Sequence, residues 1–200
     1  MYNHKNGITI RKISKNDLPI LLKLKQESWW GTHTCPLLNE KDQENWFENI
    51  PATTIVTVAV KGCDVAAISI ISDIDWISRT AYISGSVIKE YREPQIVKNC
   101  CAAQIDFAFE MLNLNRIDAE VLDFNVPAQQ LEIGYLKFQV EGRRRQAVYK
   151  CGKYYDSIIL GLLRRDWEQQ ERHLDPYSTC NTNFDHEVAD KLRTRSKYLK

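Results

Sequence analysis

The chain has 200 residues, of which 44% are hydrophobic and 26% are charged. This length suits a single hydrophobic core and leaves little room for a second domain. The 27 basic and 26 acidic side chains give a net charge of +1, which argues against a nucleic-acid partner. No run of about 18 apolar residues predicts a membrane span, and the polar segment 1–7 lacks the apolar core of a signal peptide. We therefore expect no membrane association.

The six cysteines form no Cys-x-x-Cys pair, and with four scattered histidines they give no zinc-binding spacing. A secreted disulfide scaffold would be shorter and denser in cysteine. We therefore expect reduced thiols in a cytoplasmic protein that holds no metal.

The first half of the chain predicts one strand, two helices and then three further strands. Apolar residues alternate around Ile8 and Ile10, which indicates a strand. Asn16 and Asp17 open a helix that runs to about Trp30, and Asn39 caps a second helix from Glu40 to Asn49. Segments 53–61, 65–76 and 81–88 are β-branched and separated by turn signals, which predicts an antiparallel meander.

The second half predicts a helix over 95–112, a strand over 117–124, a helix to about Lys137, and a hairpin of 141–150 with 156–163. A meander followed by a helix and one more strand predicts an α/β fold, with a mixed antiparallel and parallel sheet and helices on both faces. We expect one domain over residues 1–167. Residues 168–200 are polar and predict a tail or a helical appendage.

Several motifs after residue 107 carry a family resemblance. They are Phe107-Ala-Phe-Glu-Met-Leu-Asn-Leu-Asn-Arg-Ile117, Asn125-x-x-Ala128, Phe138-x-x-Glu141-Gly142 and Gly152-x-Tyr154-x-Asp156. In these motifs the chain resembles the GNAT superfamily of N-acyltransferases. It is most similar to the branch of spermidine, ribosomal-protein N-terminal and nucleotide-linked amino-sugar acetyltransferases. The resemblance covers about residues 7–167.

The resemblance implies a GNAT fold that moves an acyl group from acetyl-CoA or another acyl-CoA to a primary amine. The amine is expected to be a small molecule such as an amino sugar. In the family, a bulged strand and the start of the next helix hold the donor. Here that strand is 81–88, with Gly85 as the break. The residues implied in donor binding are Ser86, Val87, Ile88, Arg92, Gln95, Ile96, Val97, Lys98 and Asn125.

The loop that would hold the CoA pyrophosphate departs from the family pattern. Glu93 and Gln95 stand where the branch has glycines, and Pro94 supplies no amide. A side chain forced into the left-handed region costs about 1–2 kcal/mol, and Glu93 would repel an anion. We therefore expect weak CoA binding, with the phosphates displaced toward Arg92 or Lys98.

The proton-transfer groups also depart from the pattern. The family often has a tyrosine about five residues before a Gly-Phe pair. Here Lys137 replaces the glycine and the segment is one residue longer, so the tyrosine position falls on Glu132 or Ile133. Tyr135 is the nearest substitute, because one extra residue rotates a helix by about 100°. His33, in the loop after the first helix, is a candidate general base or substrate ligand.

Three alternatives remain open. Loss of the glycines and of the tyrosine also fits a catalytically inactive GNAT fold that binds or regulates. An acyl carrier protein is an alternative donor, because its phosphopantetheine arm lacks the adenosine pyrophosphate. The resemblance also allows a homodimer. Tyr82 stands where the polyamine branch has a glutamate, which argues against a polyamine acceptor.

Overall fold

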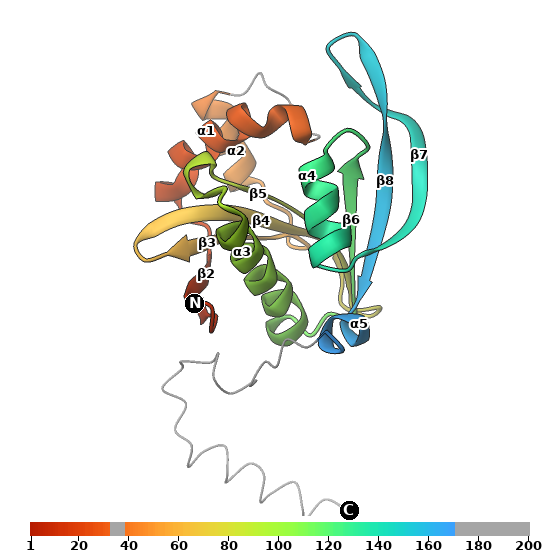
Figure 1. Cartoon of the computed structure of the whole chain (residues 1–200). Helices are drawn as coiled ribbons and strands as arrows, with labels where there is room; N and C mark the ends of the chain where they lie inside the picture. Colours follow the sequence, from red (N-terminus) through yellow and green to blue (C-terminus); the bar gives the residue numbers. More distant parts are fainter. Residues whose placement is uncertain (33–38, 171–200) are drawn as a thin grey trace, which may run out of the picture.

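The computed structural model describes residues 1–32 and 39–170, which form one eight-stranded sheet flanked by helices (Figure 1). The strands are β1 (Tyr2–Asn3), β2 (Ile8–Lys12), β3 (Ile55–Lys61), β4 (Asp64–Asp75), β5 (Thr80–Val87), β6 (Arg116–Leu122), β7 (Gln139–Lys150) and β8 (Lys153–Leu163). The helices are α1 (Leu18–Ser28), α2 (Glu40–Glu48), α3 (Pro94–Asp106), α4 (Val126–Gln129) and α5 (Arg164–Glu168). The strand order is β1-β2-β3-β4-β5-β6-β8-β7.

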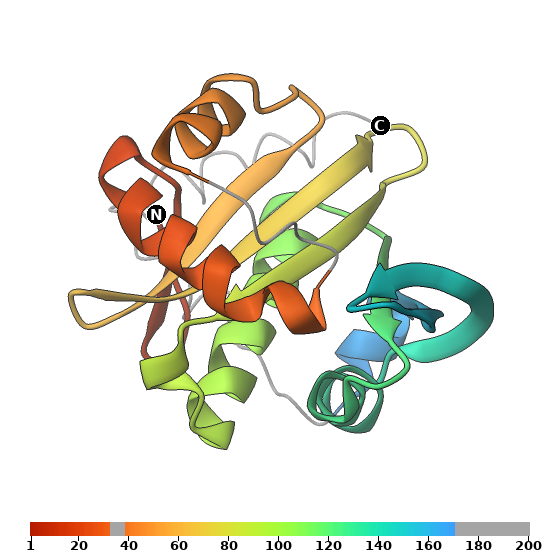
Figure 2. The same ribbon diagram turned by 90° about the horizontal axis from the view of Figure 1, so that it is seen from above.

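The predicted α/β sheet with helices on both faces is confirmed (Figure 2). On one face, Leu21 and Leu24 of α1 pack with Val56 and Val58 of β3. On the other face, α3 and the segment after α4 pack against β6 and β8, with Ile117 fully buried between them. β3 and β4 each contain four consecutive buried residues, because helices cover the sheet on both faces.

Two short elements were not predicted. β1 has only two residues, too few to show alternation, and α5 follows β8 without a turn signal. Residues 171–200 lie outside the described part of the chain, so the division at residue 167 stays a prediction. No helix in the described ranges has the length and apolar character needed to cross a bilayer.

The parallel pair in the middle of the sheet is short. β5 and β6 pair only at Thr80↔Arg116, Ala81↔Ile117 and Tyr82↔Asp118. Beyond Tyr82, β5 stays on β4, while β6 stays on β8 as far as Leu122↔Ser157. The predicted V-shaped opening between these two strands is therefore confirmed, and we call it the splay.

The two helices beside the splay both end in π-helical turns. α3 continues into Phe107–Met111, and α4 continues into Gln130–Tyr135. In the second turn the Leu136 amide bonds the Leu131 carbonyl at 2.8 Å, five residues back. A π-turn holds one residue more than an α-turn. The extra residue noted in this segment is accommodated there.

The β7–β8 hairpin extends beyond the end of β6 (Figure 1). Two of its exposed arginines are paired with carboxylates. Arg143 donates to Asp156 at 2.6 Å and to Asp123 at 3.1 Å, and Arg144 donates to Glu120 at 3.0 Å. Exposed pairs of this kind contribute about 0–1 kcal/mol each, so their main effect is to neutralise the carboxylates.

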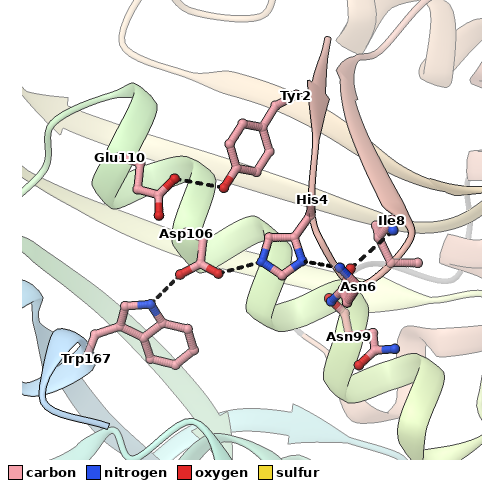
Figure 3. Close-up of polar contacts among 8 residues, drawn as sticks. All are labelled: Tyr2, His4, Asn6, Ile8, Asn99, Asp106, Glu110 and Trp167. Atoms are coloured by element: carbon pink, nitrogen blue, oxygen red, sulfur yellow. Dashed lines mark hydrogen bonds and ion pairs between the residues drawn. The ribbon is translucent and has the colours of Figure 1, made fainter. Parts of the chain in front are cut away.

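A buried polar network ties both ends of the described fold to α3 (Figure 3). Asp106 of α3 contacts His4 Nε2 at 2.8 Å and accepts a hydrogen bond from Trp167 Nε1 at 2.5 Å. The side chains of His4 and Asp106 are only 4% and 2% exposed. One turn further along, Glu110 accepts a hydrogen bond from the Tyr2 hydroxyl. Asp106 thus joins the segment after β1, α3 and α5 at one point.

We expect Asp106→Ala to destabilise the fold by about 3 kcal/mol or more, because it removes a buried acceptor from both His4 and Trp167. Urea unfolding followed by circular dichroism measures the change. Glu44→Ala, on the exposed face of α2, is the control and should stay within about 0.5 kcal/mol of wild type. An Asp106 variant as stable as this control would contradict the structural role.

Candidate functional site

The edge of β5 that faces the splay offers backbone groups without a strand partner. The Ile88 amide donates to the Ala66 carbonyl at 2.8 Å, on the β4 side. Alternate residues of an antiparallel strand bond to opposite sides, so Ser86 also faces β4. Val87 therefore faces the open edge, together with Gly85 and Ile83. Of the amides of Ser86, Val87 and Ile88, only that of Val87 points to the open edge, because those of Ser86 and Ile88 point toward β4. Donor binding by these residues stays a prediction.

Gly85 does not mark a bulge, which corrects a second expectation. The β4–β5 register runs without a shift from Ala67↔Val87 to Ser72↔Tyr82, and the irregularity lies between Ser72 and Asp75. A Cβ atom on Gly85 would lie 2.6 Å from the Ile68 carbonyl oxygen. The glycine is thus required by a close approach of the β4 backbone.

The start of α3 adopts an ordinary backbone conformation. Glu93 has φ −62° and ψ 133°, and Pro94 occupies the first helical turn. No residue from 89 to 98 has a positive φ. The strain expected from replacing glycines is therefore absent, because the loop has a different shape. Proline is well suited to this position, since an amide there has no helical partner.

The groups expected to meet phosphates lie around this helix start. Arg92 folds back, and its Nε donates to the Val87 carbonyl at 3.0 Å. Gln95 is exposed and donates to Asn99 at 2.9 Å. The amides of Gln95 and Ile96 precede the first helical bond, which joins the Val97 amide to the Glu93 carbonyl. Two amides without a helical partner thus lie at the start of α3, beside Arg92 and Lys98 and also beside Glu93.

Lys98 and Tyr135 meet across the splay. The Lys98 ammonium lies 4.8 Å from the centroid of the Tyr135 ring. Lys98 belongs to the second turn of α3, and Tyr135 ends the π-turn after α4. The structure therefore brings together a predicted donor-binding residue and the predicted proton donor. Each belongs to a different helix beside the opening.

Glu132 lies deeper, in the same π-turn. Its Oε2 atom is buried and has no hydrogen-bond partner among the described residues. Burial raises the pKa of Glu132 to about 7. Its charge also acts on two groups from neighbouring elements, because it helps to raise the pKa of Tyr82 on β5 and of Cys101 on α3. Glu132 is thus a buried carboxyl group near α3 and β5. The sequence pattern marked its position only as one where the family has a tyrosine, and it predicted no role for the carboxyl.

The other carboxylates near Tyr82 are neutralised. Burial is the largest cause of the raised Tyr82 pKa, followed by the charges of Glu120 and Glu132. Glu120 is bonded by Arg144 and by the Ser157 hydroxyl. Asp118, the partner of Tyr82 across the strand pair, is bonded by Arg116. Among the described residues, Glu132 is the one of these three carboxylates for which the structure shows no bond to a cation or a hydroxyl.

Asn125 has a structural task. Its Oδ1 accepts from the Ala128 amide at 3.4 Å as the cap of α4, and its Nδ2 donates to the Gly31 carbonyl at 3.0 Å. Beside it, Trp30 packs against Phe124 and Tyr155, with ring centroids 5.4 and 6.3 Å away. These rings form an aromatic wall at the end of β6. His33 lies outside the described residues.

The cysteines and metal-binding groups of the described chain give no second centre. Cys63, Cys100, Cys101 and Cys151 are free thiols. Burial raises the pKa of Cys100 to about 11 and of Cys101 to about 12, so both stay protonated near neutral pH. No three His, Cys, Asp or Glu side chains among residues 1–32 and 39–170 are grouped to hold a metal ion.

Known proteins that are similar in sequence to this chain are named N-acetyltransferases. No protein-family profile matches the chain. YdaF of Bacillus subtilis, provisionally named a ribosomal N-acetyltransferase, is 33% identical over 101 residues, which cover 50% of this chain and 54% of YdaF. The uncharacterized N-acetyltransferase p20 of Bacillus licheniformis is 40% identical over 63 residues, covering 32% of this chain and 35% of p20. These matches span about half or less of each relative's length.

Solved structures share the whole fold. Spermidine N-acetyltransferase of Vibrio cholerae, crystallised with CoA and spermine, superposes with a TM-score of 0.76. The match covers 82% of this chain and 99% of that protein, at 18% identity. The chain therefore has the GNAT fold. Its predicted resemblance to GNAT N-acyltransferases is confirmed by the fold and by the relatives' names.

The pKa of Glu132 predicts how stability depends on pH. The unfolded carboxyl ionises near pH 4.5, whereas the folded one holds its proton to about pH 7. Stability contributed by the neutral form is therefore present below about pH 4.5 and is lost as the pH rises to about 7. We expect Glu132→Gln to gain melting temperature relative to wild type across this window. Thermal unfolding at pH 4.5 to 8 measures it, and a pH-independent difference would contradict the buried carboxyl.

Proposed function

We propose that this protein transfers an acyl group from an acyl-CoA thioester to a primary amine. The observation that carries the proposal is the splay, where the edge of β5 is open beside the start of α3. An extended pantetheine arm can pair with that edge as a further strand would. The sequence relatives named as N-acetyltransferases support the same class of reaction.

The chain's own groups fit direct transfer. The amine nitrogen attacks the thioester carbonyl carbon, the C–N bond forms and the C–S bond breaks. Backbone amides on the open β5 edge, such as that of Val87, are the proposed donors to the oxyanion. Tyr135 is the proposed group that gives its hydroxyl proton to the departing sulfur, with its ring positioned by Lys98.

The proposed site for the donor's phosphates is the start of α3, which lacks the glycines of the family pattern. The amides of Gln95 and Ile96 and the side chain of Lys98 are the proposed contacts, while Arg92 is held by the Val87 carbonyl. Glu93 places a negative charge at this helix start. An acyl carrier protein stays the alternative donor, because its arm needs fewer contacts at this end.

The acceptor is proposed to be an amino sugar or another small amine. The wall of Trp30, Phe124 and Tyr155 suits the apolar face of a ring or a short chain. Spermine is bound by the Vibrio cholerae enzyme, but here Tyr82 and the neutralised carboxylates offer few sites for several ammonium groups. Free thiols fit a cytoplasmic setting, and assembly as a homodimer is part of the proposal.

Donor binding is tested by calorimetry. We expect acetyl-CoA to bind with a dissociation constant above about 1 μM. Lys98→Ala should weaken binding by about tenfold, the effect of one charged contact to a phosphate. Glu93→Gln should tighten it, because a like charge is removed. Lys12→Ala, on the exposed end of β2, is the control. Sub-micromolar binding that Lys98→Ala leaves unchanged would contradict this assignment.

Acetylphosphopantetheine, the same donor without its nucleotide, separates the two donor classes. Affinity within threefold of acetyl-CoA would favour the carrier protein as donor. No heat with either donor would favour the catalytically inactive fold.

Turnover tests Tyr135. A positioned general acid contributes about 10²–10⁴-fold, so we expect Tyr135→Phe to lower kcat by that factor and to leave donor affinity nearly unchanged. Release of free thiol from acetyl-CoA in the presence of a primary amine reports the rate. Tyr149→Phe, on the exposed hairpin, is the matched control. Full activity in Tyr135→Phe would remove the hydroxyl from the mechanism.

A further inference from the structure

We infer that Glu132 is the general base that accepts the proton of the attacking amine. The inference rests on the proposed acyl transfer and assigns the proton acceptor that this reaction requires. It places a second catalytic residue on the π-turn Gln130–Tyr135, which also carries Tyr135.

The geometry of the π-turn supports the assignment. Glu132 and Tyr135 are three residues apart in a turn that is wider than an α-turn, and the Glu132 carbonyl accepts from the Phe138 amide at 3.0 Å. Tyr135 faces Lys98 of α3, while Glu132 lies near Cys101 of α3 and Tyr82 of β5. The two side chains thus come from one π-turn and lie beside α3 and β5, the elements that border the opening.

The orphaned oxygen supports it independently. Buried polar atoms in folded proteins nearly always have a hydrogen-bond partner, and Oε2 of Glu132 has none among the described residues. An amine N–H in the splay would supply that partner. Neighbouring Glu120 and Asp118 are already bonded by Arg144 and Arg116, so they are not available for this task.

The electrostatic surroundings make the carboxyl a competent base. The groups on which its charge acts are Tyr82 on β5 and Cys101 on α3, and the carboxylates that also act on Tyr82 are Asp118 and Glu120 on β6. The carboxylates carry arginine partners, and burial keeps Tyr82 and Cys101 protonated near neutral pH. A base whose pKa lies near the working pH is the most effective, and that of Glu132 is about 7.

The step is balanced within the chain. As the C–N bond forms, the nitrogen loses one proton to the Glu132 carboxylate. As the C–S bond breaks, the sulfur gains one proton from Tyr135. Glu132 then returns its proton to the Tyr135 oxygen through solvent in the opening, which restores both groups.

The experiment measures steady-state rates from pH 5.5 to 9 with acetyl-CoA as donor. Spermidine, glucosamine and a peptide with a free N-terminus are the acceptors, and the fastest is kept. We expect kcat/KM of wild type to rise with pH through an apparent pKa near 7. Glu132→Gln should lower kcat by about 10²–10⁴-fold and abolish that limb, with acetyl-CoA affinity within twofold of wild type. Glu132→Asp keeps a carboxylate and should keep the limb at a reduced rate.

Glu110→Gln is the matched control. Glu110 also lies in a π-turn, after α3, and burial also raises its pKa, but it bonds to Tyr2 far from the splay. Its rate and pH profile should equal those of wild type. An active wild type with an equally active Glu132→Gln overturns this inference alone. A wild type that neither binds acetyl-CoA nor acetylates any of the three amines overturns the proposed function together with it.

Discussion

The architecture depends on one constraint, the limit of parallel pairing between β5 and β6 to three residues. β5 is held along its length by β4, and β6 by β8, so beyond Tyr82 the two strands follow different partners. Backbone groups on the free edge of β5 then need another partner, because unpaired polar groups away from water are costly. The same divergence lets α3 and α4 approach the sheet on either side of the opening. The short pairing of β5 with β6 therefore leaves the edge of β5 open and sets the positions of α3 and α4 beside it.

Arginines of the β7–β8 hairpin pair with carboxylates near the opening. Arg144 and Arg143 reach from β7 to Glu120 and Asp123, and Arg116 holds Asp118 and Glu141. These four carboxylates each have an arginine partner, although Oδ1 of Asp123 has no hydrogen-bond partner among the described residues. Glu132 is not among the carboxylates that Arg143 and Arg144 contact in the described part of the chain. Among the described residues, the structure shows no ion pair for the buried Glu132 carboxyl.

Sequence patterns predicted the order and approximate bounds of most elements, because burial on one face imposes a period of two or 3.6 residues. They could not show how a replaced glycine is accommodated. Lys137 keeps a left-handed backbone with φ 64°, whereas Glu93 adopts φ −62° in a loop of another shape. Both are the same kind of substitution in the sequence. The backbone conformation depends on the neighbouring contacts. At the end of the π-turn it stays left-handed, whereas before α3 the loop adopts another conformation.

The site residues were harder to predict than the fold because their roles depend on depth. The sequence located the position of Glu132 but gave no sign that its carboxyl is buried and unpaired, since one residue of helix register separates a solvent-facing side chain from a core-facing one. A buried carboxylate without a partner destabilises the fold in which it lies. Such a cost is typical of positions where chemistry, and not packing, sets the residue type. Glu132 acts on Tyr82, the last residue of β5 that pairs with β6, so the proposed mechanism joins this position to the open edge of β5.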